Sequence, residues 1–341
     1  MVGIRYPRAL ERGARIEVPA PSQGVPEDLH DRLHDAAAAL AQRGYDVHLR
    51  DHAKIGGLVP APAGERAADL HVAFAGRPGA VLPPWGGELA IELISQLDWE
   101  AIADSQTWFV GWSDISTLLM PLTILTGCAT LHGANLMDEP WELPTGFRRW
   151  AEVAALGEGG SFEQHAAPFR RSRPWLEWAD EPLDRETAYE KPTRWRALDE
   201  RARTTIRGRL IGGCLETVSL LAGTRFGDVP GFASRHAPEG VIVYLEVSAA
   251  EPIAVVRMLW TLRLNGWFDR ASGILIGRSN APDTNELTQA QAVERVLGDL
   301  GLPVILDFDT GHQPPQMPLV NGALAEVSID HGHGRIIQYL N

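Results

Sequence analysis

Apolar and polar positions in the first part of the chain alternate between two periods. Short apolar runs predict strands, and the stretches between them have helical spacing. In the segment 26–43, for example, Leu29, Leu33, Ala37 and Leu40 fall on one helical face. The expected strands are 15–18, 45–49, 80–82, 108–111 and 129–132, and the expected helices are 26–43, 65–74, 88–96 and a helix ending at 126. Strands that alternate with helices predict a mostly parallel sheet.

The second half of the chain has a mixed pattern. Apolar runs predict strands at 241–246, 273–277 and 304–308, with helices at 249–264 and 287–300 and short alternating strands at 323–328 and 334–340. A glycine-broken apolar segment covers 209–221. The sequence therefore predicts an α/β protein with a parallel-sheet N-terminal domain and a mixed α/β C-terminal domain.

The region between the halves changes character after the glycine-rich break at 157–160. It is charged, rich in tryptophan and poorly periodic. We therefore expect an N-terminal domain at 1–160, a linker with a tryptophan-rich substrate loop at 161–205, and a C-terminal domain at 206–341. The break is not a dinucleotide-binding fingerprint, because it does not open a helix after a strand.

Charge and cysteine usage narrow the class of protein. The formal net charge of −13 argues against binding to nucleic-acid polymers or anionic membranes, which requires a basic surface. The sequence contains no apolar signal core and no membrane-length apolar run, so we expect a cytoplasmic protein. Cys128 and Cys214 lack zinc-site spacing and are expected as small buried residues. We expect no metal and no organic cofactor.

The run FVGWSDIS, residues 109–116, carries the first candidate chemistry. An apolar strand meets Gly111, a tight turn places Ser113 at its apex, and a helix follows. This geometry exposes a hydroxyl above the sheet and leaves backbone N–H groups of the new helix free to face an oxyanion. The alternative is that Ser113 only caps the helix. A serine hydroxyl becomes a nucleophile only when a base takes its proton.

Glu246 and His312 are the candidates for an orienting carboxylate and a base. Glu246 ends an apolar strand, and His312 lies in DTGHQPP just after another strand. The order serine, glutamate, histidine suits a nucleophile, an orienter and a base. Both residues could instead be solvent-exposed, at a strand end and in a loop.

Several motifs together resemble the LD-carboxypeptidase family of serine peptidases, which includes the microcin C immunity peptidases. They are PAPSQG, GERAADLHVAFA, WGGE, FVGWSDIS, LHGAN, GRLIGG, DTGHQPP and LVNGALAEV, in this order along the chain. The resemblance implies an N-terminal α/β domain that carries the serine. It also implies a C-terminal domain with a β-barrel-like part, and a homodimer.

The resemblance also assigns roles to residues. It makes Ser113 the nucleophile, His312 the general base and then acid, and Glu246 the orienter. The oxyanion hole would consist of the backbone N–H of Asp114 and one from the Gly86–Gly87 turn. Glycines suit this turn because backbone without Cβ can approach a substrate closely.

Two departures from the family pattern concern the substrate. Trp85 and Glu88 flank the glycine pair where peptidoglycan-recycling members have arginine and tyrosine, and Cys214 stands where asparagine is common. The WGGE form is more similar to the immunity branch.

The tryptophan-rich loop bears on the same question. The resemblance implies that Trp175 and Trp178 stack on a nucleotide, with Arg173 near a phosphate-like group. Alternatively, these tryptophans, with Trp195, close a domain interface.

Three functions remain open at this point. The first is cleavage of an amide between a terminal amino acid and a modified nucleotide, for self-immunity or detoxification. The second is removal of D-alanine from murein tetrapeptides. The third is a binding protein that has lost turnover.

Overall fold

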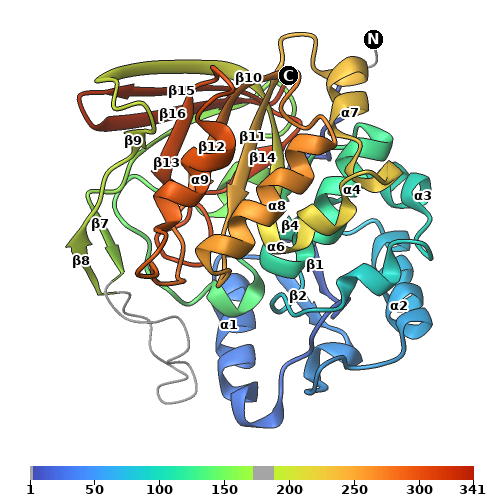
Figure 1. Ribbon diagram of the computed structural model, residues 1–341. Helices are drawn as coiled ribbons and strands as arrows, with labels where there is room; N and C mark the ends of the chain where they lie inside the picture. Colours follow the sequence, from blue (N-terminus) through green and yellow to red (C-terminus); the bar gives the residue numbers. More distant parts are fainter. Residues whose placement is uncertain (1–2, 172–187) are drawn as a thin grey trace.

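The computed structural model describes residues 3–171 and 188–341, which form two large sheets (Figure 1). The first sheet has the strand order β14-β5-β4-β3-β1-β2. Its strands are β1 (Arg15–Val18), β2 (Asp46–Leu49), β3 (Ala80–Val81), β4 (Trp108–Gly111), β5 (Thr130–His132) and β14 (Leu319–Asn321). Strands β1 to β5 are parallel, and β14 pairs antiparallel with β5. A strand from the end of the chain thus completes the N-terminal sheet.

The second sheet has the strand order β6-β16-β15-β10-β11-β12-β13-β9. Its strands are β6 (Ser161–His165), β9 (Arg196–Ala197), β10 (Arg203–Cys214), β11 (Val241–Glu246), β12 (Ala271–Gly277), β13 (Val304–Phe308), β15 (Leu324–Asp330) and β16 (His333–Tyr339). Strands β10 to β13 are parallel, and the others pair antiparallel. A separate hairpin joins β7 (Phe169–Arg171) to β8 (Tyr189–Pro192).

Helices connect and cover both sheets. The α-helices are α1 (His30–Gln42), α2 (Ala63–Ala75), α3 (Trp99–Asp104), α4 (Ser116–Thr126), α5 (Trp150–Ala154), α6 (Leu215–Val218), α7 (Val229–His236), α8 (Pro252–Leu264) and α9 (Gln289–Leu297). The 3₁₀ turns are η1 (Glu27–Leu29), η2 (Asp51–Lys54), η3 (Ala90–Leu93), η4 (Ser113–Ile115), η5 (Leu136–Asp138), η6 (Ser219–Leu221) and η7 (Arg225–Gly227). Among residues 3–171 and 188–341, no helix has the length and apolar character needed to span a bilayer.

The mixed α/β class predicted from the sequence is confirmed, with a parallel N-terminal sheet and a mixed second sheet. In place of the expected barrel-like part, the C-terminal half forms the eight-stranded mixed sheet, which runs from β6 at one edge to β9 at the other. Residues 161–205, expected as a linker and loop, include β6 and β9, which form the two ends of that sheet.

Two local predictions differ from the structure. The helix expected at 88–96 is only the short 3₁₀ turn η3, in which N–H groups bond to carbonyls three residues back, as Ile94 does to Ile91. The apolar spacing that suggested a helix also suits this turn, since Ala90 and Leu93 are both buried. The glycine-broken segment at 209–221 begins inside the long strand β10 and continues into α6.

The two sheets share one apolar core. Val110 of the first sheet and Ile211 and Val243 of the second belong to the same cluster of buried side chains. The glycine pair of β10 permits this close approach. A Cβ on Gly213 would lie 2.6 Å from the Cβ of Ser116 at the start of α4, and one on Gly212 would collide with the Tyr244 carbonyl. The GRLIGG motif therefore brings β10 against α4 and the turn that carries Ser113.

Candidate functional site

Ser113 lies at the sharp turn between β4 and α4, as the sequence predicted. Its φ is +60°, in the left-handed region that non-glycine residues seldom occupy. Hydrogen bonds of neighbouring residues hold the backbone in this strained conformation. The Trp112 N–H donates to the Asn135 side-chain oxygen at 3.3 Å, and the Ile115 N–H donates to the Trp112 carbonyl at 3.2 Å. The turn lifts the Ser113 side chain above the carboxyl end of the sheet.

Ser113, His312 and Glu246 form a continuous hydrogen-bonded relay. The Ser113 Oγ lies 3.0 Å from His312 Nε2, and His312 Nδ1 lies 2.7 Å from Glu246 Oε2. Ser113 comes from the first sheet, Glu246 ends β11, and His312 lies in the loop after β13. Two hydrogen bonds, both to His312, therefore link three residues for which the sequence indicated only the order along the chain.

Glu246 is completely buried, and glycines make room for it. A Cβ on Gly311 would lie 2.7 Å from Glu246 Oε2, and one on Gly277 would lie 3.1 Å from the Glu246 Cβ. Burial by itself raises the pKa of this carboxyl, but the charge and hydrogen bond of His312 outweigh it, so the pKa is lowered from 4.5. Glu246 is therefore ionised and fixes the orientation of the imidazole.

The pKa of His312 is shifted in the complementary direction. Burial alone would lower it, but the charge of Glu246 and the hydrogen bond to it raise the pKa above 6.5. The Trp112 ring packs beside the imidazole, with centroids 4.4 Å apart, and the Trp112 Nε1–H donates to Asp138 Oδ2 at 2.8 Å. Asp138 is fully enclosed, and burial raises its pKa to about 7.

Two residues that support the Trp112 ring were not among the residues predicted for the site. Asn135 and Asp138 form a reciprocal cap at η5, and both contact Trp112. The LHGAN motif ends at Asn135, so a short motif just after a predicted strand was the available signal. It showed that the segment belonged to a pattern, but not that it holds the ring beside His312.

Gly86 lies directly beside Ser113. A Cβ on Gly86 would be 2.8 Å from the Ser113 Cβ, 2.9 Å from its Oγ and 3.2 Å from the Asp114 backbone nitrogen. The space in front of Ser113 thus exists because residue 86 lacks a side chain. Asp114 belongs to the first turn after the strand, where N–H groups have no intrahelical partner. Gly87 has a φ of +139°, and a Cβ added there would meet Ser22 and Gln23 rather than Ser113.

The Asp114 side chain holds three segments of the N-terminal half together. Its Oδ2 accepts hydrogen bonds from Ser22 Oγ at 2.5 Å and from the Ala90 N–H at 2.8 Å. Burial raises its pKa, and these donors partly oppose the shift. Ser22 lies in the PAPSQG turn, so this early motif supports the turn that carries Ser113.

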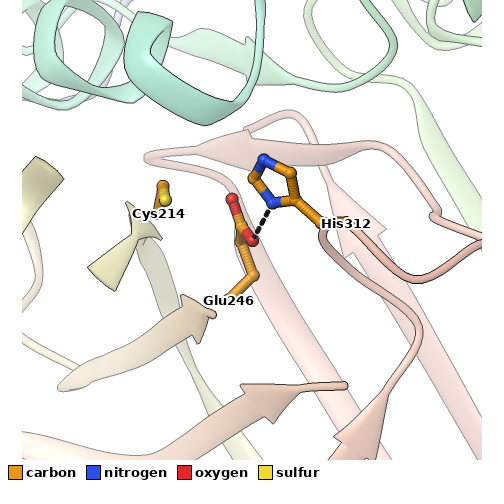
Figure 2. Close-up of side chains that lie close together, drawn as sticks. All are labelled: Cys214, Glu246 and His312. Atoms are coloured by element: carbon orange, nitrogen blue, oxygen red, sulfur yellow. Dashed lines mark hydrogen bonds and ion pairs between the residues drawn. The ribbon is translucent and has the colours of Figure 1, made fainter. Parts of the chain in front are cut away.

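Cys214 lies beside the relay at the end of β10 (Figure 2). Its Sγ, a Glu246 carboxylate oxygen and a His312 ring nitrogen all lie within 4.8 Å of one another. These atom types are able to ligate a metal, although the Glu246–His312 hydrogen bond already uses two of the donors. Both cysteines are buried as predicted, and burial raises the pKa of Cys128 to about 11 and that of Cys214 well above 9.0.

The residues predicted to contact substrate have different surroundings. Trp85 is partly buried against the core and its Nε1–H donates to the Gly24 carbonyl at 3.3 Å, whereas Glu88 is exposed. Trp195, grouped with the loop, is a core residue that stacks on Phe308 and donates to Asp309 at 2.8 Å. Trp175, Trp178 and Arg173 lie outside the described residues.

A serine turn at the end of a parallel sheet lies opposite a histidine–carboxylate pair carried by a second sheet. This arrangement is typical of the hydrolase class of proteins. The chain matches the LD-carboxypeptidase N-terminal domain over residues 16–133 and the LD-carboxypeptidase C-terminal domain over residues 207–327. The chain therefore belongs to the LD-carboxypeptidase family.

Three relatives illustrate the range of the family. A protein of Streptomyces coelicolor provisionally named a carboxypeptidase is 30% identical, over 96% of this chain and 94% of its own length. The microcin C7 self-immunity protein MccF of Escherichia coli is 24% identical, over 73% of this chain and 71% of its own. A Bacillus subtilis protein named as a murein peptide carboxypeptidase is 26% identical, over 68% of this chain and 63% of its own.

Solved structures agree on the fold. An MccF-like protein of Bacillus anthracis has a TM-score of 0.82 at 22% identity, covering 99% of this chain and 100% of the other. MccF in complex with glutamyl sulfamoyl guanosine has a TM-score of 0.79 at 19% identity, covering 98% of each chain. At these identities the likeness establishes the fold.

Proposed function

We propose that this protein is a serine-type carboxypeptidase or amidase in which Ser113 is the nucleophile, His312 the base and Glu246 the orienter. The observation that carries the proposal is the relay from Ser113 Oγ to His312 Nε2 at 3.0 Å and on to Glu246 at 2.7 Å. A protein that only binds its ligand has no need of this arrangement, so the relay disfavours the third function considered above.

The chemistry follows from these positions. The Ser113 Oγ attacks the amide carbonyl carbon as its proton passes to His312 Nε2, and the oxyanion faces the backbone N–H groups of Asp114 and Gly86. Collapse of the tetrahedral intermediate breaks the C–N bond, and His312 donates the proton to the leaving amine. Water then hydrolyses the acyl-enzyme by the reverse use of the same groups. Each oxyanion donor contributes about 3 kcal/mol to transition-state stabilisation.

The proposed substrate is an amide that links a terminal amino acid to a modified nucleotide. Support comes from the immunity branch: MccF is a relative, and it has been solved with glutamyl sulfamoyl guanosine and with aspartyl sulfamoyl adenosine. The partly buried Trp85 next to the glycine turn is the feature of this chain that fits that branch.

Hydrolysis of two substrates by wild-type and Ser113→Ala protein tests the proposal. We expect an aminoacyl sulfamoyl-adenosine to be cleaved, and the rate to fall by at least about 10⁴-fold in the variant because the nucleophile is lost. Mass spectrometry identifies the products. Ser105→Ala, which removes another serine hydroxyl of the same half, is the control and should keep its activity. Equal rates in wild-type and Ser113→Ala protein would contradict the role of Ser113.

Removal of D-alanine from a murein tetrapeptide is the second candidate. It is favoured by the relative named as a murein peptide carboxypeptidase and by a muramoyltetrapeptide carboxypeptidase structure from Oxalobacter formigenes with a TM-score of 0.70. Release of D-alanine without cleavage of the nucleotide conjugate would select this function over the first.

Four further expectations belong to the proposal. They are a homodimer, a cytoplasmic location, the domain boundaries at 160 and 206, and substrate contacts by Trp85 and Glu88 and, in the tryptophan-rich loop, by Trp175, Trp178 and Arg173. Light scattering coupled to gel filtration measures the oligomeric state. A monomeric mass for active protein would contradict the homodimer.

A further inference from the structure

A cavity of about 670 Å³ opens beside the loop that carries His312. We call it the arginine cavity, because four arginines and two aspartates line it: Arg170, Arg194, Arg196, Arg278, Asp283 and Asp307. The concentration of guanidinium groups stands out in a chain whose formal net charge is −13. Four positive and two negative side chains leave the lining with a positive formal charge, which favours anionic ligands.

The arginine cavity shares its walls with the His312 loop. Gln313, the residue after His312, lines it. Asn280, which lies between two lining residues, donates to the His312 carbonyl at 2.7 Å. Arg278 donates to the carbonyl groups of Gln313 and Pro315, at 3.1 Å and 2.7 Å. The cavity is therefore one residue along the chain from the proposed base.

Two of the four arginines are already neutralised by partners. Arg196 pairs with Asp307 at 2.5 Å, and the buried Arg278 pairs with the buried Asp309 at 2.5 Å. Among residues 3–171 and 188–341, no carboxylate lies within ion-pair distance of Arg170 or Arg194. Within the described part of the chain, Arg170 and Arg194 are thus the lining arginines that no ion pair engages, and they are the two that we expect to meet a ligand.

Arg170 is held close to a like charge. It is half-buried on β7, and the next residue, Arg171, donates its backbone N–H to the Pro314 carbonyl of the His312 loop at 2.9 Å. Burial and the positive charge of Arg278 lower the pKa of Arg170 from 12.5. A bound anion would offset both the burial of the Arg170 charge and its repulsion from Arg278. A guanidinium group can also donate two parallel hydrogen bonds to phosphate or carboxylate oxygens.

We propose that the arginine cavity is a subsite for an anionic, phosphate-like group of the substrate, bound by Arg170 and Arg194. The inference rests on the proposed function, because it assumes that the substrate extends from Ser113 past His312. It goes further by requiring a charged group in the part of the substrate that lies beyond the scissile amide.

Calorimetric titration with inorganic phosphate at low ionic strength tests the cavity without turnover. The full-length wild-type protein should bind phosphate, and Arg170→Gln and Arg194→Gln should each weaken binding about tenfold or more, because each removes a charge-assisted contact. Arg257→Gln, which changes an exposed arginine of α8 outside the cavity, is the control and should bind like wild type. Absence of binding, or equal affinity in all four proteins, would overturn the proposal.

Kinetics then distinguish the substrate's anionic group from free phosphate. Phosphate should compete with the aminoacyl sulfamoyl-adenosine, and Arg170→Gln should raise KM about tenfold with little change in kcat. Phosphate that binds without affecting KM would show a site for the free ion only and overturn the subsite. If no substrate is hydrolysed, the proposed function fails, while the titration still decides whether the cavity binds anions.

Discussion

At the scale of single residues, the site depends on opposite shifts in two pKa values. Glu246 is buried yet ionised because His312 lies against it, and the pKa of His312 is raised because Glu246 lies against it. A base with a raised pKa is protonated at a higher pH than an ordinary histidine. The activity proposed here should therefore fall as the pH drops through a value above 6.5.

Glu246→Gln tests this coupling. Loss of the carboxylate removes the effects that raise the pKa of His312 and leaves burial, which lowers it, so the acid limb of kcat/KM should move to lower pH. The rate at the optimum should drop by about 10³–10⁴-fold, because the imidazolium loses its stabilising charge. A pH–rate profile measures both. Glu326→Gln, which changes a half-buried carboxylate on β15, is the control. An unmoved acid limb would show that another group titrates.

At the scale of elements, the Gly86–Gly87 turn packs closely against the turn that carries Ser113. The Gly86 backbone lies against Ser113, and the Asp114 carboxylate links this region to Ser22 and to η3. The geometry around Ser113 therefore depends on contacts among three segments of the chain: the Ser113 turn, the segment from Gly86 to η3, and the turn that contains Ser22.

Gly86→Ala should block the space in front of Ser113. The added Cβ would lie 2.9 Å from the Ser113 Oγ, too close for an unshifted side chain, while the backbone φ at this position is not in the left-handed region. We expect kcat to fall by about 10²-fold or more with the thermal midpoint nearly unchanged. Gly64→Ala in α2 is the matched control, since its nearest neighbour is 3.6 Å away. Wild-type kcat in Gly86→Ala would argue against an oxyanion site there.

At the scale of the whole molecule, activity requires the two sheets to keep one relative position. Ser113 follows β4 of the first sheet, whereas Glu246 ends β11 of the second sheet and His312 lies in the loop after β13. The buried Asn321 of β14 connects them: its side chain donates to Thr130 Oγ1 at 3.1 Å and accepts from the Gly212 N–H and the Tyr244 hydroxyl, at 3.2 Å and 2.9 Å.

Asn321→Ala should therefore weaken both stability and activity. Leaving buried donors unsatisfied should lower the free energy of unfolding by about 2–4 kcal/mol, and kcat should fall because the relay joins the sheets that Asn321 holds together. Urea denaturation and steady-state kinetics on the folded protein measure the two effects. Asn265→Ala, at the exposed end of α8, should change stability by less than about 1 kcal/mol. Unchanged kcat in folded Asn321→Ala protein would separate the sheet junction from the site.

Local patterns were sufficient to predict the core of the fold. Apolar runs predicted β1 to β5 and β11 to β13 because strand and helix periods depend on neighbours a few residues apart. The strand–turn–helix pattern at 109–116 predicted the Ser113 turn for the same reason. The pattern failed at 88–96, where only the 3₁₀ turn η3 forms, because an apolar spacing of three residues suits either kind of helix.

The sequence by itself determined the α/β class, the serine at a turn apex and the order serine, glutamate, histidine. Only the tertiary structure decided that Ser113 meets His312 across 199 positions of chain, that His312 meets Glu246 across 66, and that β14 completes the first sheet. It also decided that Arg170, Arg194, Arg196 and Arg278 share one cavity. The physical reason is that hydrophobic period and turn chemistry act over a few residues, whereas distances and charges in a site are set by packing between segments far apart in the chain.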